Sequence, residues 1–415
     1  MLLAVALAAC SHWPFATVRS QPLKFVLATH GLPQDGMWKS TPLLADLDED
    51  GSLDLIALPR LGHGAQVWLG DGKGGWREAS AGLDLAASCG GGVAAADLNR
   101  DGHLDLVVAD HCAGVFVYLG DGHGHWRAVT QGLNPAAAQQ APASADGDNP
   151  FTGAEDVAVA DVNHDGFPDL VVAARQEGGI TVYFGDGSGR KWTEAHGDGL
   201  PKSGWANKLL VTDIDGDGHP DLVASDVDGP RVWRGDGRGH WQASSQGLPH
   251  PNAGGFYRQI AVGDVNGDGR LDLAFANMRN GVELYLQTEA GTWQAAPPPM
   301  PVMTGGAMSV ALADLDRDGH LDLVVGGRMS LKSHYGLFVL HGDGKGGWSR
   351  LQNTDLPADG LTFVWGITLA DVNRDGLPDL AVSTGTAPLE RDPQEPAPRL
   401  QVWLNHYRRP SPGAR

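Results

Sequence analysis

The residues with the most evident chemistry are aspartates that recur in a fixed pattern along the 415-residue chain. The pattern reads Asp-x-[Asp/Asn]-x-Asp-Gly-x-x-Asp-Leu. Oxygen donors at positions 1, 3 and 5, followed by a glycine that lets the chain turn sharply around an ion, are typical of calcium loops. Oxygen donors without His or Cys favour Ca²⁺ over transition metals, and a full protein cage disfavours Mg²⁺. The copies begin at Asp46, Asp97, Asp161, Asp213, Asp264, Asp314 and Asp371.

A metal-free interpretation of each loop is an Asx turn, in which the carboxylates accept hydrogen bonds from backbone amides. Seven such loops at once disfavour it, because three or four carboxylates in each would repel one another unscreened. We expect the ions to brace the fold rather than to hold a ligand.

The acidity of the chain is concentrated in these loops. There are 50 acidic residues against 30 Lys and Arg, and the formal net charge is −20. This balance disfavours a nucleic-acid partner, which needs a basic footprint. The ligand positions of the loops hold 24 of the 50 acids, so the net charge without these carboxylates is +4, and seven Ca²⁺ would leave −6 overall. The rest of the surface is therefore free to be locally basic.

The elements around each loop repeat with it, at intervals of 51, 64, 52, 51, 50 and 57 residues. An apolar run precedes the loop and a second follows it, while a third alternates and meets a Gly-Asp-Gly-x-Gly turn before a Trp. A short fourth run ends in Gly-Leu-Pro or a relative. Four short strands with Gly-rich turns predict a propeller blade, and helical periodicity is absent. The Trp residues are Trp76, Trp126, Trp192, Trp241, Trp293 and Trp348.

The two ends of this array complement each other. The last repeat stops at its third strand, 400–404, and lacks the Trp. Phe25 lies six residues before the Gly of a Gly-Leu-Pro, the offset that separates Trp241 from Gly247. We therefore predict an all-β, seven-bladed β-propeller with four antiparallel strands per blade, over residues 23–407 with a tail at 408–415. Residues 23–30 should form the outer strand of the last blade and close the ring.

The repeats over nearly the whole mature chain resemble the FG-GAP/VCBS repeat family, whose propellers include the head of integrin α subunits. The resemblance implies that each loop joins the first two strands of a blade. It also implies about seven Ca²⁺ sites, each bound by side chains at positions 1, 3, 5 and 9 and by the backbone carbonyl at position 7. The implied ligands are Asp46, Asp48, Asp50, Ser52 and Asp54 (loop 46–54); Asp97, Asn99, Asp101, His103 and Asp105 (97–105); Asp161, Asn163, Asp165, Phe167 and Asp169 (161–169); Asp213, Asp215, Asp217, His219 and Asp221 (213–221); Asp264, Asn266, Asp268, Arg270 and Asp272 (264–272); Asp314, Asp316, Asp318, His320 and Asp322 (314–322); and Asp371, Asn373, Asp375, Leu377 and Asp379 (371–379).

The first ten residues form an apolar run that is too short to span a bilayer and is typical of an export signal. Its end, Leu-Ala-Ala-Cys10, resembles the lipobox of bacterial lipoproteins, which are cleaved before the lipid-bearing cysteine. This implies an exported protein anchored through Cys10 in the cell envelope (outer membrane, periplasm or cell surface), with residues 11–22 as a linker. The alternative is a plain signal peptide and a secreted protein. No other segment approaches 18 apolar residues.

The other two cysteines are Cys89 and Cys112. Export would allow them to pair. If Asp97 faces Asp105 across its loop, Cys89 lies opposite residue 113, one position from Cys112. We predict a cross-strand disulfide, with two buried thiols as the alternative.

The two faces of such a propeller should differ. The Asp loops and Gly-rich turns share one face, and the length variation falls on the other, with the longest insertions at 134–150 and 384–399. Aromatic and cationic residues at the edges of that face could bind a protein segment, a sugar or an anionic polymer. Alternatively, the aromatic residues fill the channel and the arginines balance nearby acids. The candidates are Trp38, Trp205, Phe256, Tyr257, Arg258, Trp365, Arg60, Arg175, Arg279 and Arg328.

The sequence carries little that indicates catalysis. It contains no Gly-x-Ser-x-Gly elbow and no His-Glu-x-x-His motif. It therefore favours a monomeric binding or adhesion module for a protein or glycan ligand. The alternatives are a polysaccharide-active lyase or hydrolase and a structural subunit of a cell-envelope complex.

Overall fold

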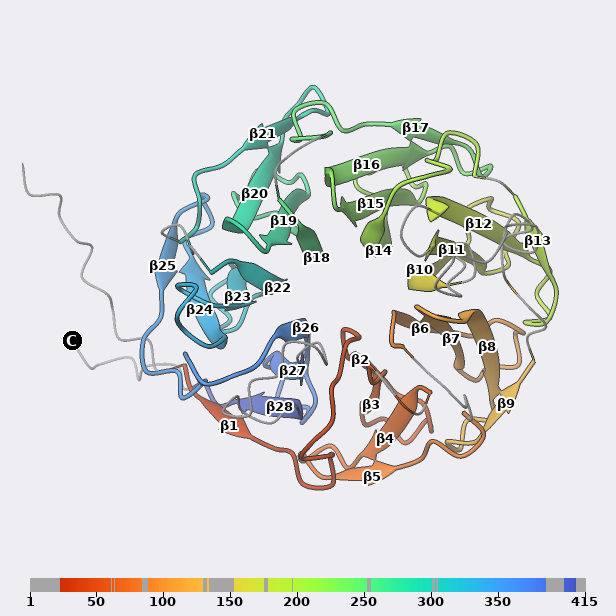
Figure 1. Cartoon of the computed structure of the whole chain (residues 1–415), viewed down its shortest axis with the longest axis horizontal. Coiled ribbons are helices and arrows are strands. Elements are labelled where there is room, and N and C mark those ends of the chain that lie inside the picture. Colours follow the sequence, from red (N-terminus) through yellow and green to blue (C-terminus); the bar gives the residue numbers. More distant parts are fainter. Residues whose placement is uncertain are drawn as a thin grey trace, which may run out of the picture.

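Strands of four kinds build the ring, and they differ in their distance from its axis (Figure 1). The structure is a computed structural model that describes residues 23–60, 62, 64–83, 89–129, 133, 153–174, 178–195, 197–251, 255–300, 303, 305–385 and 399–407. In this part of the chain, 28 strands form seven four-stranded antiparallel sheets, and no helix is long and apolar enough to cross a membrane. The predicted seven-bladed propeller is confirmed. The export signal, Cys10 and the linker lie outside the described residues.

Each blade contributes one strand to each of four positions, from the axis outward. Innermost are β2 (Leu43–Ala45), β6 (Val93–Ala96), β10 (Ala154–Ala160), β14 (Ala206–Thr212), β18 (Tyr257–Gly263), β22 (Ala307–Ala313) and β26 (Val364–Ala370). Second are β3 (Asp54–Ala57), β7 (Asp105–Asp110), β11 (Asp169–Ala174), β15 (Asp221–Asp226), β19 (Asp272–Asn277), β23 (Asp322–Gly327) and β27 (Asp379–Thr384). Third are β4 (Gln66–Gly70), β8 (Gly114–Gly120), β12 (Ile180–Gly185), β16 (Gly229–Gly235), β20 (Gly281–Gln287), β24 (Gly336–Gly342) and β28 (Leu400–Asn405). Outermost are β5 (Trp76–Glu78), β9 (Trp126–Ala128), β13 (Trp192–Glu194), β17 (Trp241–Ala243), β21 (Trp293–Ala295), β25 (Trp348–Arg350) and β1 (Phe25–Leu27).

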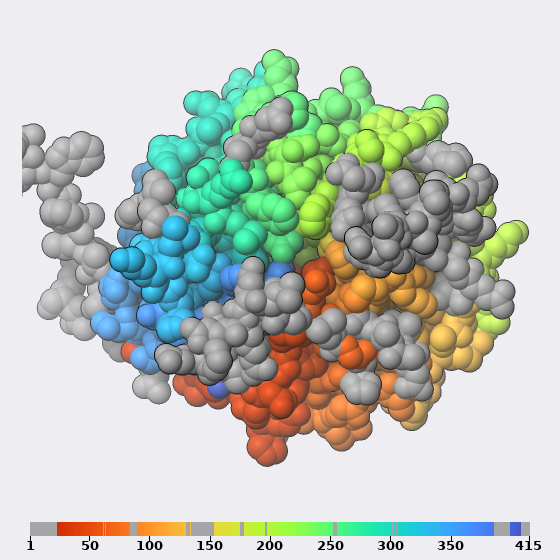
Figure 2. All heavy atoms as spheres, in the orientation of Figure 1, coloured from red at the N-terminus to blue at the C-terminus, as the bar shows by residue number. Residues whose placement is uncertain are grey.

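The ring closes by pairing of the first and last strands. β1 runs antiparallel to β28, with Phe25 opposite Asn405 and Leu27 opposite Trp403. The first and last blades, red and blue, therefore lie side by side (Figure 2). The prediction of closure by the N-terminal strand is confirmed, although the strand is shorter than the predicted 23–30. Without β1, the outer edge of β28 would be left unpaired.

The hydrophobic core lies between the blades. The second strands are buried along their whole length, as in β7 and β11, because a neighbouring blade packs on each face of the sheet. Between the last and first blades, for example, Leu55 and Trp68 pack with Leu400 and Val402. Sheets that are covered on both faces favour continuous apolar runs, which explains the unbroken Leu-Val-Val pattern after several of the Asp loops.

Each blade is joined to the next by the Gly-Leu-Pro segment. The Trp76 backbone N–H donates to His30 O, just before Gly31, at 2.9 Å. Gly31 has a φ of +95°, and a Cβ there would lie 1.9 Å from Trp76 O. Gly82 meets Trp126 O in the same way. Only glycine allows this close approach, which explains why Gly and Trp recur together.

Candidate functional site

The Asp loops lie between the innermost and second strands, on one face of the ring. Loop 46–54 joins β2 to β3, and its last residue, Asp54, is the first residue of β3. The other six loops occupy the equivalent place in their blades. The repeat of the sequence is therefore a repeat of position in space.

The aspartate at position 9 is almost completely buried in every loop and ties three strands together. In the first blade, Leu47 N donates to Asp54 Oδ2 at 2.7 Å, and Gly70 N, at the end of β4, donates to Asp54 Oδ1 at 2.8 Å. The same two backbone bonds recur at Asp105, Asp169, Asp221, Asp272, Asp322 and Asp379. The sequence pattern indicated these aspartates as ion ligands, and it did not indicate that they also accept backbone hydrogen bonds.

Without a nearby cation, the ionised form of these buried carboxylates is disfavoured. Burial raises the pKa of Asp54 to about 7, and the charges of Asp48 and Asp46 act in the same direction, against its two backbone hydrogen bonds. Burial raises the pKa of the equivalent Asp105 and Asp379 to about 6. A nearby cation would favour the ionised form.

The aspartates at positions 1, 3 and 5 converge. One oxygen each from Asp46, Asp48 and Asp50 lies within 4.8 Å of the others, and Asp314, Asp316 and Asp318 form the same arrangement. Asp46 Oδ1 is buried and accepts no hydrogen bond from the described residues. Backbone amides bind some of the remaining oxygens, for example Gly51 N on Asp46 Oδ2 at 3.0 Å, as in an Asx turn. The converging oxygens and the unpaired acceptor fit a hard dication such as Ca²⁺.

Four loops have Asn at position 3, and its amide reduces the repulsion within the loop. Asn99 Nδ2 donates to Asp101 Oδ2 at 2.8 Å, while Asn99 Oδ1 accepts the Asp101 backbone N–H. Asn163, Asn266 and Asn373 make the same side-chain bond. The amide oxygen still faces the loop as a neutral donor to an ion.

Residues at position 4 connect neighbouring loops. Arg374 Nη2 donates to Ser52 Oγ at 2.9 Å, across the closure of the ring, and Arg317 Nε donates to Gly376 O at 2.9 Å. Glu49 contacts His103 in the next loop at 2.5 Å. These three position-4 residues adopt a positive φ of 55–60°, which non-glycine residues rarely do. These contacts form a belt that links the sixth, seventh, first and second loops.

The opposite ends of the inner strands form the channel mouth. Five of these strands carry a register shift at the same place, which leaves one or two residues out of the ladder. Such β-bulges re-aim side chains. The bulged residues include Glu155, Asn207, Arg258, Met308 and Trp365, all six positions before the first Asp of their loops. Glu155 and Asn207 are absent from the candidates predicted by sequence, and this shared offset is the signal that could have identified them.

Four bulged side chains line a small cavity of about 30 Å³ at the mouth, together with two lysines. Its charged and polar lining residues are Lys39, Glu155, Asn207, Lys208 and Arg258. A second cavity of about 210 Å³ is lined by the inner strands and includes Asp156, Lys208 and Gln259. The described part of the mouth is therefore lined by both positively and negatively charged side chains.

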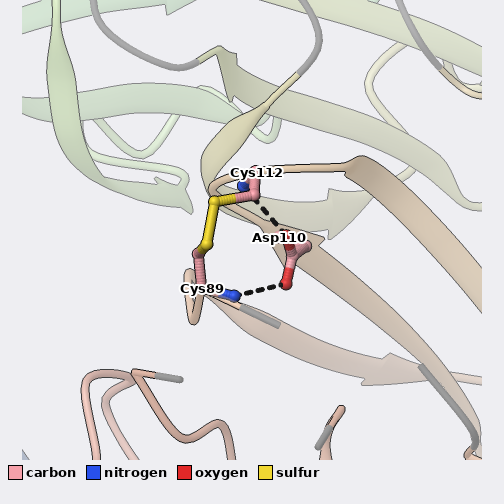
Figure 3. Close-up of side chains that lie close together, drawn as sticks. All are labelled: Cys89, Asp110 and Cys112. Atoms are coloured by element: carbon pink, nitrogen blue, oxygen red, sulfur yellow. Dashed lines mark hydrogen bonds between the residues drawn. A yellow bond between two sulfur atoms is a disulfide. The ribbon is translucent and has the colours of Figure 1, made fainter. Parts of the chain in front are cut away.

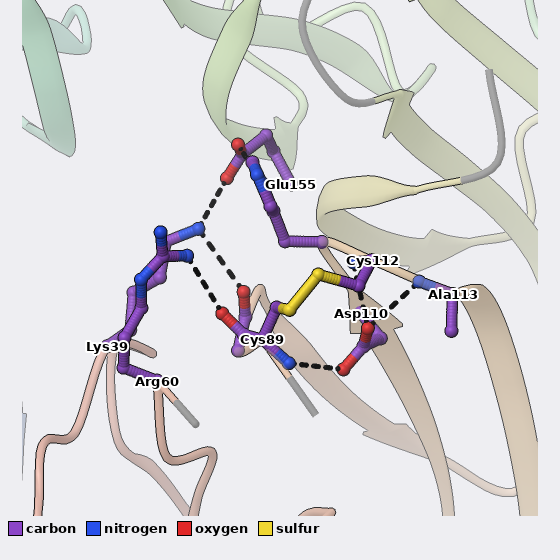
Figure 4. The surroundings of a disulfide bond; sticks show 9 residues. Lys39, Arg60, Cys89, Asp110, Cys112, Ala113 and Glu155 are labelled. Carbon is purple, nitrogen blue, oxygen red and sulfur yellow. Dashed lines mark hydrogen bonds and ion pairs between the residues drawn. A yellow bond between two sulfur atoms is a disulfide. The ribbon is translucent and has the colours of Figure 1, made fainter. Parts of the chain in front are cut away.

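Two ion pairs neutralise part of this mouth. Lys39 Nζ lies 2.9 Å from Glu155 Oε2, and both side chains are almost fully buried (Figure 4). His111 Nδ1 contacts the other oxygen of Glu155. Lys208 Nζ lies 2.8 Å from Asp156 Oδ1. Burial lowers the pKa of Lys39 to about 8, whereas the Lys39 ammonium and His111 hold the pKa of Glu155 well below its ordinary value despite its burial.

Arg258 is the central cation of the mouth. Its guanidinium lies between two rings, 5.0 Å from the centroid of Phe256 and 4.8 Å from that of Trp365. Arg258 Nη1 donates to Asn207 Oδ1 at 2.8 Å. Arg258 Nε is buried and has no acceptor among the described residues. Burial lowers the pKa of Arg258 to about 10, so that it stays charged at neutral pH.

Trp205 stands beside this arginine cluster. Its ring packs edge-on against Phe256, with centroids 5.8 Å apart. Trp205 Nε1 is buried and, like Arg258 Nε, finds no acceptor in the described part of the chain. Two unpaired donors thus belong to one group of aromatic and cationic side chains.

The other ligand-face candidates are more dispersed. Trp38 is buried against Trp68, with ring centroids 5.4 Å apart, and Tyr257 is buried and donates to Glu283 Oε2. These two belong to the core rather than to the surface. The four remaining candidates are arginines: Arg60 donates to Cys89 O, Arg328 donates to Gly305 O, Arg279 is exposed, and Arg175 lies outside the described residues.

A disulfide joins Cys89 to Cys112 beside the mouth (Figure 3). Asp110 holds both ends, since its Oδ2 accepts Cys89 N at 3.1 Å and its Oδ1 accepts Cys112 N at 2.9 Å. The next carbonyls face the mouth: Cys89 O accepts Arg60 Nη1 at 3.1 Å, and Gly90 O accepts Lys39 Nζ at 3.2 Å (Figure 4). The disulfide therefore fixes a segment that positions two cations.

The fold and the acidic loops define a class of protein: a seven-bladed β-propeller with an Asp loop in every blade. The model of the FG-GAP-like repeat family matches residues 46–108, 97–172, 161–224, 213–275 and 264–325, and the chain belongs to this family. The matched repeats start at the first five Asp loops.

Solved structures resemble the chain in fold at low sequence identity. Two crystal structures of BBS1N in complex with ARL6DN, one soaked with mercury and one with lead, give TM-scores of 0.52 and 0.53. The mercury structure is 12% identical and covers 91% of this chain and 94% of that one, and the lead structure is 13% identical and covers 93% and 98%. A lectin of Agrocybe aegerita, described as recognising non-reducing terminal N-acetylglucosamine, gives 0.49 at 19% identity, with coverage of 78% and 81%. A search of curated proteins found no match.

Proposed function

We propose that this protein is an exported binding module that holds a protein or glycan ligand at the channel mouth, on a propeller braced by calcium. The observation that carries the proposal is the pair of buried donors, Arg258 Nε and Trp205 Nε1, that lack acceptors among the described residues. Buried polar groups are ordinarily hydrogen-bonded, so unpaired donors at a cavity call for an acceptor from a ligand or from water.

The charge of the mouth indicates what kind of ligand it would favour. Lys39 and Lys208 are paired with carboxylates, whereas Arg60 and Arg258 donate to the neutral oxygens of Cys89 and Asn207. These two arginines can therefore bind a carboxylate of a ligand without first breaking an ion pair. The flanking aromatic rings offer apolar contact to a sugar ring or a peptide segment. An acidic glycan or an acidic protein segment combines these features.

The fold is compatible with partner binding, since BBS1N is in complex with ARL6DN in the two similar structures. Fold alone does not determine function, however, so the proposal depends on the mouth residues themselves. For the Asp loops we propose bound Ca²⁺, which would stabilise the blades and take no part in ligand binding. We also propose export, with an anchor at Cys10, on the basis of the apolar run of residues 1–10, and a disulfide suits an oxidising compartment.

The test uses two variants that remove the unpaired donors with little change of volume, Trp205→Phe and Arg258→Gln. Immobilised protein would be probed with a glycan array containing acidic and neutral glycans, and with solubilised cell-envelope proteins. We expect the double variant to lose ligand capture at an unchanged melting temperature. The matched control is Arg127→Ala, which removes an exposed cation from the outer strand β9 and should leave capture intact.

Retention of full binding by the double variant would refute the mouth as the site. Turnover of a bound polysaccharide would show instead that the protein is an enzyme with its active site at the mouth. Stable co-purification with envelope proteins that does not depend on Trp205 or Arg258 would indicate a structural subunit instead.

A further inference from the structure

The sixth Asp loop differs from the others in the side chain that stands above it. The third strand of each blade ends with the residue whose backbone N–H binds the position-9 aspartate, and the residue before it borders the loop. In the sixth blade that residue is His341, whose side chain is 19% exposed. The equivalent residues are Leu69, Leu119, Phe184, Arg234, Leu286 and Leu404.

His341 brings both ring nitrogens close to the carboxylates of the loop. Nδ1 lies 3.0 Å from Asp322 Oδ1 and 3.8 Å from Asp316 Oδ2, and Nε2 lies 3.6 Å from Asp318 Oδ2. One ligand atom each from Asp316, Asp322 and His341 lies within 4.8 Å of the other two. Ligands of one metal ion at bonds of about 2.0–2.2 Å lie no more than about 4.4 Å apart, so the 3.0 and 3.8 Å separations suit a shared ion.

A second observation points to a ligand at this place. Asp316 is only 5% exposed, and its Oδ1 accepts no hydrogen bond within the described part of the chain. His341 does not donate a hydrogen bond to the other oxygen of Asp316 either, because the 3.8 Å between Nδ1 and Oδ2 is beyond hydrogen-bond distance. The Nδ1 of His341 faces Asp322 Oδ1, which already accepts the Gly342 N–H. One buried carboxylate oxygen, Asp316 Oδ1, thus remains without a donor near an imidazole.

The fourth loop shows what an internal cation looks like in the same setting. There Arg234 replaces the leucine and donates directly to Asp215 Oδ2. A protonated His341 would be the corresponding cation in the sixth loop, but it makes no hydrogen bond to Asp316. A neutral imidazole offers instead a nitrogen lone pair to a metal.

We propose that the sixth loop is a mixed nitrogen–oxygen site, formed by His341, Asp316 and Asp322, that binds a borderline dication of the Zn²⁺ type in preference to Ca²⁺. Imidazole suits Zn²⁺ and the later first-row metals, whereas Ca²⁺ prefers oxygen ligands. The site goes beyond the proposed function, since it depends neither on the mouth nor on the other six loops holding calcium.

The test is a Co²⁺ titration of the full chain, stripped of metal and then saturated with Ca²⁺, followed by visible absorption and by competition with Zn²⁺. We expect one Co²⁺ equivalent that resists excess Ca²⁺ and is displaced by Zn²⁺. His341→Leu should abolish the binding of this Co²⁺ equivalent or weaken its affinity by more than roughly tenfold. Loss of a residue that only supports a metal ligand already costs about tenfold in affinity. Leucine occupies the same place in four other blades, so this variant should fold.

Two further variants keep the result decisive. Asp316→Asn preserves shape and His341 but removes the unpaired carboxylate, and it should also weaken Co²⁺ binding. His123→Lys removes an exposed histidine from a hairpin turn of the second blade, at a place where the sixth blade has Lys345, and it should leave the equivalent intact. Equal titrations of the unmodified protein and His341→Leu, or complete displacement of Co²⁺ by Ca²⁺, would overturn the proposal. Calcium-dependent melting, measured on His341→Leu, reports on the other loops separately.

Discussion

The two faces of this propeller neutralise charge in opposite ways. The loop face gathers 24 carboxylates into seven similar sites, and cationic side chains contact only some of these carboxylates, as Arg234 contacts Asp215 and Arg270 contacts Asp268. The channel mouth places its acids in direct ion pairs, Lys39 with Glu155 and Lys208 with Asp156. If the loops bind Ca²⁺ as proposed, the first face would depend on ions from solution, whereas these acids of the second face are already paired with lysines.

This difference separates what the repeat preserves from what it allows to vary. At the loop face, every position-9 aspartate makes the same two backbone hydrogen bonds, so a change in any blade would disturb the same support. At the mouth, the bulged position holds a different residue in each of the five blades that have the bulge, for example Glu155, Arg258 and Trp365. A repeated face suits a structural role, and an unrepeated one suits recognition of a particular ligand.

Removal of divalent ions is expected to have the largest effect on stability. A ligand that binds only the folded state contributes about 2.7 kcal/mol per site at 100 times its dissociation constant. With several such sites, the melting temperature in excess EDTA should fall by roughly 10 °C or more relative to excess Ca²⁺. Scanning calorimetry of the full chain tests this. Equal melting temperatures in EDTA and in Ca²⁺ would show that Ca²⁺ does not stabilise the loop face.

Breaking the Lys39–Glu155 pair should have the next largest effect. Glu155→Gln leaves Lys39 buried without its partner, and the loss of one member of a buried pair costs about 3–5 kcal/mol. Denaturant unfolding in saturating Ca²⁺ measures this cost without interference from the loops. A cost below about 1 kcal/mol would mean that the mouth is more solvated than its burial indicates.

The same pair predicts a dependence on pH. Because the pKa of Glu155 is held well below its ordinary 4.5, the folded state releases this proton more readily than the unfolded chain does. Its contribution is therefore complete above about pH 4.5 and is lost as the pH falls toward the folded pKa. The difference in unfolding free energy between the unmodified protein and Glu155→Gln should shrink as the pH falls below about 4.5. A difference that grows below that pH would contradict the assignment.

Loss of the disulfide should cost less than loss of the ion pair. Cys89 and Cys112 are 23 residues apart, and closing a loop of that length in the unfolded chain is worth about 3 kcal/mol. The double variant Cys89→Ser/Cys112→Ser should therefore be destabilised by about that amount. Because Arg60 and Lys39 donate to Cys89 O and Gly90 O, ligand capture should weaken too, while the shift caused by Ca²⁺ should remain. A smaller Ca²⁺ shift would link the two faces.

The sequence predicted the architecture well because the repeat carries it redundantly. Seven Asp loops and the displaced outer strand at Phe25 each point to the same closed ring, so no single motif had to be decisive. The mouth was harder to predict, because it depends on bulges that shift a strand by one residue. Trp38 and Tyr257 have suitable residue types, yet the structure buries them, and Glu155 became relevant only once its bulge was known.

The contacts between loops should have the smallest effect, which would separate the belt from the ions it surrounds. Arg374 Nη2 donates to Ser52 Oγ, but its side chain is 53% exposed, and exposed contacts of this kind contribute about 0–1 kcal/mol. Arg374 also has a φ of +60°, a conformation that costs a non-glycine residue about 1 kcal/mol.

Arg374→Gly should therefore change the unfolding free energy by only about 0.5 kcal/mol, because the lost contact and the relieved strain offset each other. Gly216 and Gly267 occupy the same position in the fourth and fifth loops, which indicates that an Asp loop can form with glycine there. Arg374→Ala loses the contact and retains the strain, so it should be the less stable of the two variants in denaturant unfolding. If Arg374→Ala were the more stable, the positive φ would not be imposed by the loop. A reduced Ca²⁺ shift in either variant would show that the belt, and not only the carboxylates within each loop, contributes to ion binding.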